Sequence, residues 1–284
     1  MVSGIGKLTL REIRRSLGRF LAIAAIVALG VGFFCGLRLT KTAMVRTLDA
    51  YTEAQQMYDF RLVSTIGFDE TDAAKIAADS RVAACEGTKS ADALTSIAGG
   101  ASRACKFLSL PETIDLPSLK AGRMPQTADE CLADGMLYSE KDLGQTIVLS
   151  EENDDDTLGQ FTRREFTIVG IAKSVLYINY ERGSTSVGSG SLSAFVYVLP
   201  EAFDFDYDTE LYLRLTDRAG EIYSDEYKAH IDAAESWVTA LAEQCADDRG
   251  TRLHDDAAET LADARETLDE KQQELADAKQ KLED

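Results

Sequence analysis

The chain has 284 residues, of which 45% are hydrophobic, so it can bury the core of one large domain or two small ones. Its formal net charge is −19, which argues against nucleic acid as a partner, because phosphate binding needs clustered Lys and Arg. Residues 1–19 hold five basic side chains against one acidic side chain, whereas most carboxylates lie beyond residue 48. A basic start and an acidic remainder are typical of an exported domain held by a membrane anchor.

The first segment, residues 1–19, is amphipathic. Its apolar side chains fall on one helical stripe with arginines elsewhere, and such a helix can lie in the headgroup layer of a membrane. We expect it to be cytoplasmic, with these membrane-facing or partner-facing residues: Leu10, Ile13, Arg14, Arg15, Leu17 and Arg19. A positively charged flank without any protein partner explains the same composition.

An uncharged run follows from Phe20 to Leu37, and at 1.5 Å per residue it covers roughly 27 Å. This length predicts a transmembrane helix over residues 20–39. A cleaved signal peptide is the main alternative, but its apolar core normally has only about 7–15 residues. Lys41 also occupies the −3 position of a cleavage site after Ala43, where a small residue is needed. We therefore expect an uncleaved anchor in the cell membrane, with residues after about 40 extracellular.

Residues 40–223 predict an extracellular core domain in which helices and strands alternate irregularly, which favours an α+β fold. The helices are expected at 40–59 and at 69–78, the second capped by Asp69 or Thr71. Residues 116–129 read as loop and 151–159 as a polar turn. Apolar and β-branched runs predict strands at residues 60–66, 82–85, 91–97, 103–110, 146–150, 164–174, 194–199 and 210–215.

Residues 224–284 predict a helical arm that Gly250 bends or caps. Leucines recur every seven residues along its second half, and this spacing predicts a coiled-coil seam formed by Leu261, Leu268, Leu275 and Leu282. Lys271 occupies a core position and weakens the seam there. A single stripe cannot bury itself, so we expect a partner helix, either a return helix further along a longer chain or a helix of another molecule.

The motifs of enzymes are absent from the sequence. It contains no phosphate-binding loop and no nucleophile elbow, and its two histidines leave few general bases, so we predict neither catalysis nor a cofactor. The Asp204, Asp206 and Asp208 series resembles an EF-hand loop but lacks its glycine and glutamate. None of the five cysteines forms a CxxC pair, so a metal site is not predicted. The spacing leaves the disulfide state open for Cys85, Cys105, Cys131 and Cys245.

Several segments resemble a known family. The opening LTLREIRRSLGRFLAIAAIVALGVGFFCGLRLT is similar to the start of FtsX-like (MacB-like) ABC transporter permeases. YDFRLVST, LKAGRMPQTADEC and IVGIAKSVLYINYERGSTSVGSGSLSAFVYV resemble long Gram-positive members, and the closing heptads resemble a coiled-coil insertion found in some of them. The GRMP and YINYERG stretches are the more specific parts.

The resemblance implies an α+β extracellular domain and a dimeric or pseudo-dimeric permease that pairs with a separate cytoplasmic ATPase. ATP hydrolysis would then move the extracellular domain, either to export a lipid, peptide or lipoprotein or to activate an enzyme outside the cell. A single-pass surface adaptor or sensor, whose coiled coil binds an extracellular protein, is the alternative that needs no ATPase.

Overall fold

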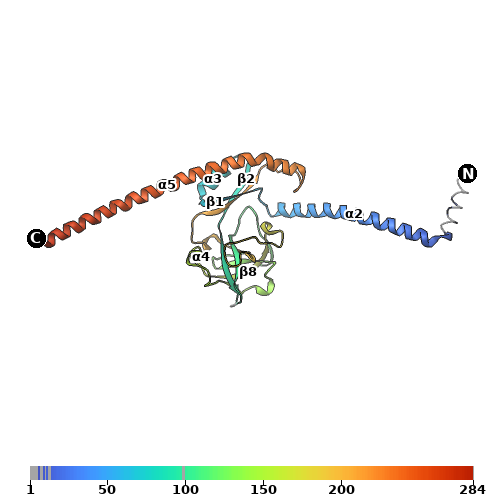
Figure 1. Cartoon of the computed structure of the whole chain (residues 1–284), viewed down its shortest axis with the longest axis horizontal. Coiled ribbons are helices and arrows are strands. Elements are labelled where there is room, and N and C mark those ends of the chain that lie inside the picture. The colour runs from blue at the N-terminus through green and yellow to red at the C-terminus, as the bar shows by residue number, and fades with distance from the viewer. Residues whose placement is uncertain (1–5, 7–8, 10, 12–13, 98–99, 284) are drawn as a thin grey trace.

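The computed structural model describes residues 6, 9, 11, 14–97 and 100–283, with only the backbone described for residues 276–278 and 280–283. The chain consists of one long N-terminal helix, a folded α+β body, and one long C-terminal helix that leaves the body at its far side (Figure 1). The mixed α+β architecture expected from the sequence is therefore confirmed.

The N-terminal helix α2 spans Leu17–Ala54. Its 38 residues correspond to about 57 Å at 1.5 Å per residue. Large apolar side chains along it face outward, for example Ile26 at 72% and Leu29 at 74% exposure. By length and composition this helix can cross a membrane. The helix continues past the predicted span of residues 20–39. Its last turns pack against the folded body, whereas its first turns are exposed.

The smaller sheet has the strand order β1-β10-β2, all antiparallel, with bounds Phe60–Phe68, Asp208–Leu215 and Val82–Thr88. Helix α3, Glu70–Ala77, packs beside it and begins at Asp69, whose carboxylate accepts from the Asp72 backbone N–H. Asp69 is thus the cap, one of the two candidates in the sequence.

The larger sheet has the order β5-β8-β6-β9-β4-β3-β7, and β7 also pairs with β8. This second pairing closes six of the strands into a barrel and leaves β5 outside it. The strand bounds are Ser118–Gly122, Glu165–Lys173, Glu130–Asp134, Ala194–Val198, Arg103–Ser109, Ser90–Ile97 and Thr146–Leu149. Phe107, Phe161 and Phe166 pack against one another in its core, with ring centroids 5.0–6.3 Å apart.

Three local predictions were wrong. Residues 116–129 are not all loop, because β5 pairs with β8 there; it ends at Gly122, where a φ of +78° and the Val169 carbonyl leave no room for a side chain. Strand β6 was missed, since five residues carry too little periodicity to be recognised. The polar turn at 151–159 contains a short helix, α4 (Asp155–Gly159), capped by Asp154.

The C-terminal helix α5 runs unbroken over Asp225–Glu283, about 88 Å for its 59 residues. Gly250 does not end it, so the predicted interruption of the helix there was wrong. Arginines on both sides of this glycine hold the helix against the start of α3: Arg249 bonds Asp69, and Arg252 bonds Asp72 at 2.7 Å. These contacts outweigh the helix propensity lost at glycine, which is about 1 kcal/mol.

The first half of α5 covers the smaller sheet. Ala234, Val238 and Cys245 are buried against strands β1 and β10 and helix α3, and Arg81 stacks on Trp237 with 3.9 Å between guanidinium carbon and ring centroid. The second half projects alone beyond the body (Figure 1).

Candidate functional site at the junction of helix α2 with the core

The end of α2 is attached to the segment that leads into α5. Glu53 accepts from Arg214 at 3.2 Å and also bonds Arg218. One turn earlier, Asp49 accepts from the backbone N–H of Ile222 at 2.8 Å. Residues far apart in sequence therefore fasten α2 to the start of the arm through charged side chains.

The loop after α2 is held by the loop between β4 and β5. Asp115 accepts from the Tyr58 backbone N–H at 3.1 Å, and the backbone N–H groups of Asp115 and Leu116 donate to the carbonyls of Gln56 and Gln55. The Asp115 side chain is almost fully buried, and burial raises its pKa to about 7. The junction thus contains a buried carboxyl group without a cationic hydrogen-bond partner among the described residues.

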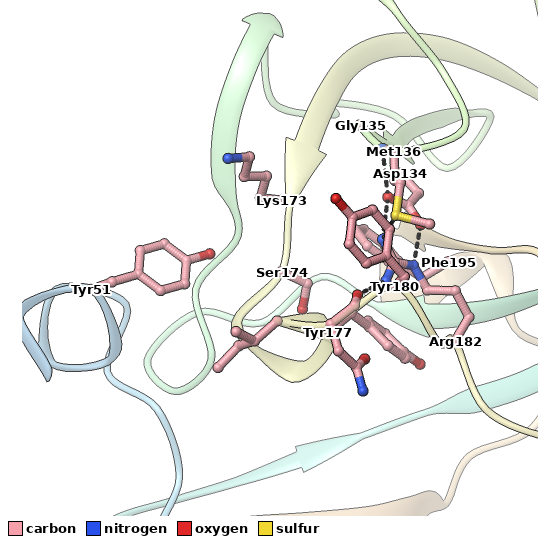
Figure 2. A pocket seen from close by; sticks show the side chains of 12 residues that line it. Tyr51, Asp134, Gly135, Met136, Lys173, Ser174, Tyr177, Tyr180, Arg182 and Phe195 are labelled. Carbon is pink, nitrogen blue, oxygen red and sulfur yellow. Dashed lines mark hydrogen bonds and ion pairs between the residues drawn. The ribbon is translucent and has the colours of Figure 1, made fainter. Parts of the chain in front are cut away.

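A cavity of about 400 Å³ opens beside Tyr51, in the last turns of α2 (Figure 2). Its other walls come from the end of β6, the end of β8 and the segment that follows β8. That segment contains the YINYERG stretch at residues 177–183. The cavity therefore lies where the first long helix meets the barrel.

A buried ion pair supports the cavity floor. Arg182 donates to Asp134 at 2.5 Å and 3.0 Å, and the two side chains are 5% and 2% exposed. Arg182 also donates to the Asn179 carbonyl at 2.6 Å. Its guanidinium lies 5.4 Å and 5.7 Å from the ring centroids of Tyr177 and Phe195, which stack on each other. The charges of Arg182 and Asp134 are therefore paired within the protein.

The local sequence explains how this wall forms. Strand β8 ends at Lys173, and the Ser174 hydroxyl accepts from the Leu176 N–H to start the short 3-10 helix Val175–Tyr177. The same hydroxyl bonds the buried Tyr197 hydroxyl at 2.7 Å. Ser174 thus turns the chain so that Tyr177 faces the cavity.

The rim of the cavity is solvent-exposed and combines apolar and aromatic side chains with a lysine. Met136, Ile178 and Tyr180 are 48%, 52% and 85% exposed. Lys173 lies on the same rim, and among the described residues it forms no ion pair. Figure 2 shows Lys173 and Tyr51 on one side of the opening and Met136, Tyr180 and Arg182 on the other.

A second cavity of about 280 Å³ shares Tyr177 and Arg182 with the first. It contains Glu210, which accepts from Arg61 at 2.6 Å through both oxygens and from the Tyr212 hydroxyl at 2.6 Å. Burial would raise the pKa of Glu210, but these hydrogen bonds outweigh it and the pKa is lowered. The Glu210 carboxylate is hydrogen-bonded by Arg61 and Tyr212 within the protein. Its role in this cavity is therefore structural, and it is not an open charged site.

The structure brings together few of the residues singled out in the sequence. Arg14, Arg15, Leu17 and Arg19 are exposed on the N-terminal helical segment, whereas Leu10 and Ile13 lie outside the described residues. In α5, Leu261, Leu268 and Leu275 are 52%, 57% and 58% exposed, and the side chain of Leu282 lies outside the described part. The coiled coil therefore stays a prediction, because these leucines contact no partner helix in the described chain.

The cavity residues were missed. YINYERG was recognised as a specific stretch, but its pattern gave no role to Tyr177 or Arg182, and no signal marked Asp134 or Tyr51. Among the described residues no three His, Cys, Asp or Glu side chains gather as metal ligands. The five cysteines are unpaired thiols in this structure, and burial raises the pKa of Cys85 to about 12.

Comparison with known proteins gives structural likeness only. No family model matches the chain, and no curated protein matches it. The chain is similar to the periplasmic region of MacB from Actinobacillus actinomycetemcomitans, with 10% identity, a TM-score of 0.34, and coverage of 63% of this chain and 76% of that one.

Two further solved structures are similar. One is the extracellular domain of the noncanonic ABC-type transporter YknZ from Gram-positive bacteria, with 9% identity, a TM-score of 0.37, and coverage of 54% and 76%. The other is a domain of a permease protein from Porphyromonas gingivalis, with 16% identity, a TM-score of 0.33, and coverage of 59% and 70%. At such low identity and TM-score the likeness carries no argument about function.

Proposed function

We propose that this chain is the N-terminal part of a permease subunit of an FtsX/MacB-like ABC transporter. In this role α2 is the first membrane span, the two sheets form an extracellular domain, and a separate cytoplasmic ATPase supplies the energy. The export of a lipid, peptide or lipoprotein, or the mechanical activation of an extracellular target, is the corresponding output.

One observation carries the proposal. Helix α2 is continuous from its exposed apolar half to the turn that Glu53 and Asp49 fasten to the segment before α5. A helix that tilts or shifts in a membrane would therefore act on the segment before α5 through these contacts. A passive tether has no need of such a connection.

The positions of the other expected partners follow from this placement. Arg14, Arg15 and Arg19 would lie at the cytoplasmic end of the span, where basic residues accumulate. There they can contact lipid headgroups or the ATPase. A second copy of the permease, or a second half of a longer chain, would supply the other side of the dimeric or pseudo-dimeric assembly.

The test uses the full-length protein in its native membrane. Alkaline extraction should leave the protein in the membrane fraction, and purification should recover a cytoplasmic ATPase with it. Leu29→Arg, in the middle of the span, should prevent integration, because a central arginine costs about 2.5–3.5 kcal/mol. Val63→Arg, at a similarly exposed apolar position of β1, is the matched control. Release of the wild type by alkali, or the absence of any ATPase, would overturn the proposal.

The exposed leucine stripe of α5 favours a second candidate, a single-pass adaptor whose arm binds an extracellular protein. The adaptor candidate predicts that Leu268→Glu abolishes the function of the protein, whereas removal of the ATPase leaves that function intact. The permease proposal predicts that either change, Leu268→Glu or removal of the ATPase, abolishes the function.

A further inference from the structure

The cavity beside Tyr51 has the surface of a site for an apolar group. Its floor is formed by the stacked rings of Tyr177 and Phe195, and its rim by Met136 and Ile178. The buried charges near it, Asp134 and Arg182, bond each other, so they leave no open charge for a polar ligand. A volume of about 400 Å³ lies within the range of about 300–1,000 Å³ found for small-molecule sites.

A stripe on α2 leads from the apolar span to this cavity. Leu37, Met44 and Tyr51 recur at intervals of seven residues, which places them on one face of the helix. Leu37 and Met44 are 56% and 67% exposed, and Tyr51 lines the cavity. From Leu37 to Tyr51 the stripe covers about 21 Å at 1.5 Å per residue.

Two charged residues of this part of α2 lie on another face, because Arg46 and Asp49 contact Glu221 and the Ile222 backbone on the side toward α5. Lys41, four residues after Leu37 and three before Met44, lies on the same face as the stripe. Its aliphatic stem can lie along apolar surface while its amine reaches water. An apolar molecule that follows the stripe therefore passes one cation, which can keep its hydration.

We infer that this cavity binds the acyl chain of an anionic membrane amphiphile, which reaches it from the outer leaflet along the stripe of α2. The apolar path and the aromatic floor fit an aliphatic chain, and Lys173 on the rim is placed to meet a negatively charged headgroup. The inference rests on the proposed function, because it requires α2 to span a membrane.

Photolabelling of the full-length protein in phosphatidylcholine vesicles tests the inference. Two probes carry a diazirine at the end of the acyl chain: a free fatty acid and a lysophosphatidylglycerol. Peptide mapping should place label on Met136 and on residues 177–180, in addition to α2. Labelling by both probes would show that the acyl chain alone is sufficient for binding, so that a free fatty acid can be the ligand. Labelling only by the lysophosphatidylglycerol would identify a phospholipid as the ligand and indicate a contact with its headgroup. Lys173→Gln should weaken that contact.

Ile178→Asp should reduce cavity labelling about tenfold or more, since a carboxylate on the rim disfavours an aliphatic chain, and a factor of ten corresponds to about 1.4 kcal/mol. Labelling of residues 20–37 should not change and serves as the internal reference. Val63→Asp, an exposed apolar residue of β1, is the matched control. If Ile178→Asp fails to fold, Met44→Asp on the stripe gives the same prediction without altering the cavity wall.

Three results would overturn the inference: no label at the cavity in the wild type, unchanged label in both Ile178→Asp and Met44→Asp, or a photoreactive residue at position 178 that cross-links to another polypeptide segment. In each case membrane integration and recovery of the ATPase are measured separately. The proposed permease function would then stand while the acyl site falls.

Discussion

The carboxylate of Glu53, in the last turn of α2, binds the guanidinium of Arg218, which lies 165 residues later in the segment before α5. Arg218 also stacks on Tyr227 in the first turn of α5, with 5.3 Å to the ring centroid. One side chain thus contacts the end of the first long helix and the start of the last. Through Arg218 the two long helices α2 and α5 are therefore connected.

Glu53→Ala should loosen this junction locally without unfolding the domain. The Glu53 side chain is 53% exposed, and exposed ion pairs contribute about 0–1 kcal/mol, so the free energy of unfolding should change little. Amide hydrogen exchange of residues 55–59 should become faster, because Arg218 loses its acceptor and Arg214 keeps only Gln56. Glu152→Ala, at an exposed loop position, is the control. Unchanged exchange in Glu53→Ala would contradict the connection.

Asp115→Asn should stabilise the protein at alkaline pH. The folded-state pKa is raised from 3.8 to about 7, so as pH rises through this window the unfolded state releases its proton first and stability falls. Above about pH 7 the loss is complete and stability no longer changes through this group. Asparagine keeps the acceptor for the Tyr58 N–H and tolerates the φ of +58°.

Urea unfolding at pH 4 and pH 8 tests this effect of Asp115. The variant should gain on the order of 2–4 kcal/mol relative to the wild type at pH 8 and little at pH 4. Glu112→Gln, at a neighbouring exposed carboxylate, is the control variant. An equal difference between variant and wild type at both pH values would refute the assignment.

Arg182→Met should destabilise the barrel by about 3–5 kcal/mol, because it leaves the Asp134 carboxylate buried without its partner. The double variant Asp134→Leu/Arg182→Met should recover most of that loss, since an apolar pair needs no desolvated charge. Arg123→Met breaks the exposed pair with Glu130 and should change the thermal stability much less than Arg182→Met does. Thermal unfolding of the four proteins tests the order, and a double variant as unstable as the single one would show that the pair has another role.

Leu268→Glu should leave the free energy of unfolding within about 0.5 kcal/mol of the wild type, because the side chain is 57% exposed. It should nevertheless abolish association through the arm. Lys271→Leu should strengthen association, since Lys271 occupies a core position of the heptads and its only described ion pair is with Glu274. Sedimentation of the full-length protein with each substitution measures both effects, and destabilisation by Leu268→Glu would show that the leucine is already packed.

The sequence by itself determined the features that depend on neighbouring residues. The uncharged run predicted the exposed apolar helix, the alternation in residues 60–66 and 210–215 predicted strands β1 and β10, and Asp69 was recognised as a cap candidate. Each is a local signal, because hydrophobic periodicity and capping act within one or two turns or a single strand.

The tertiary structure decided what depends on distant contacts. Strand β6 becomes a strand because β8 and β9 pair with it on both sides, and α5 passes Gly250 because α3 holds the neighbouring arginines. The cavity needs Tyr51, Asp134 and Arg182 to meet from three separate segments. No window of sequence contains all three, so only the folding of the barrel against the end of α2 could create the site.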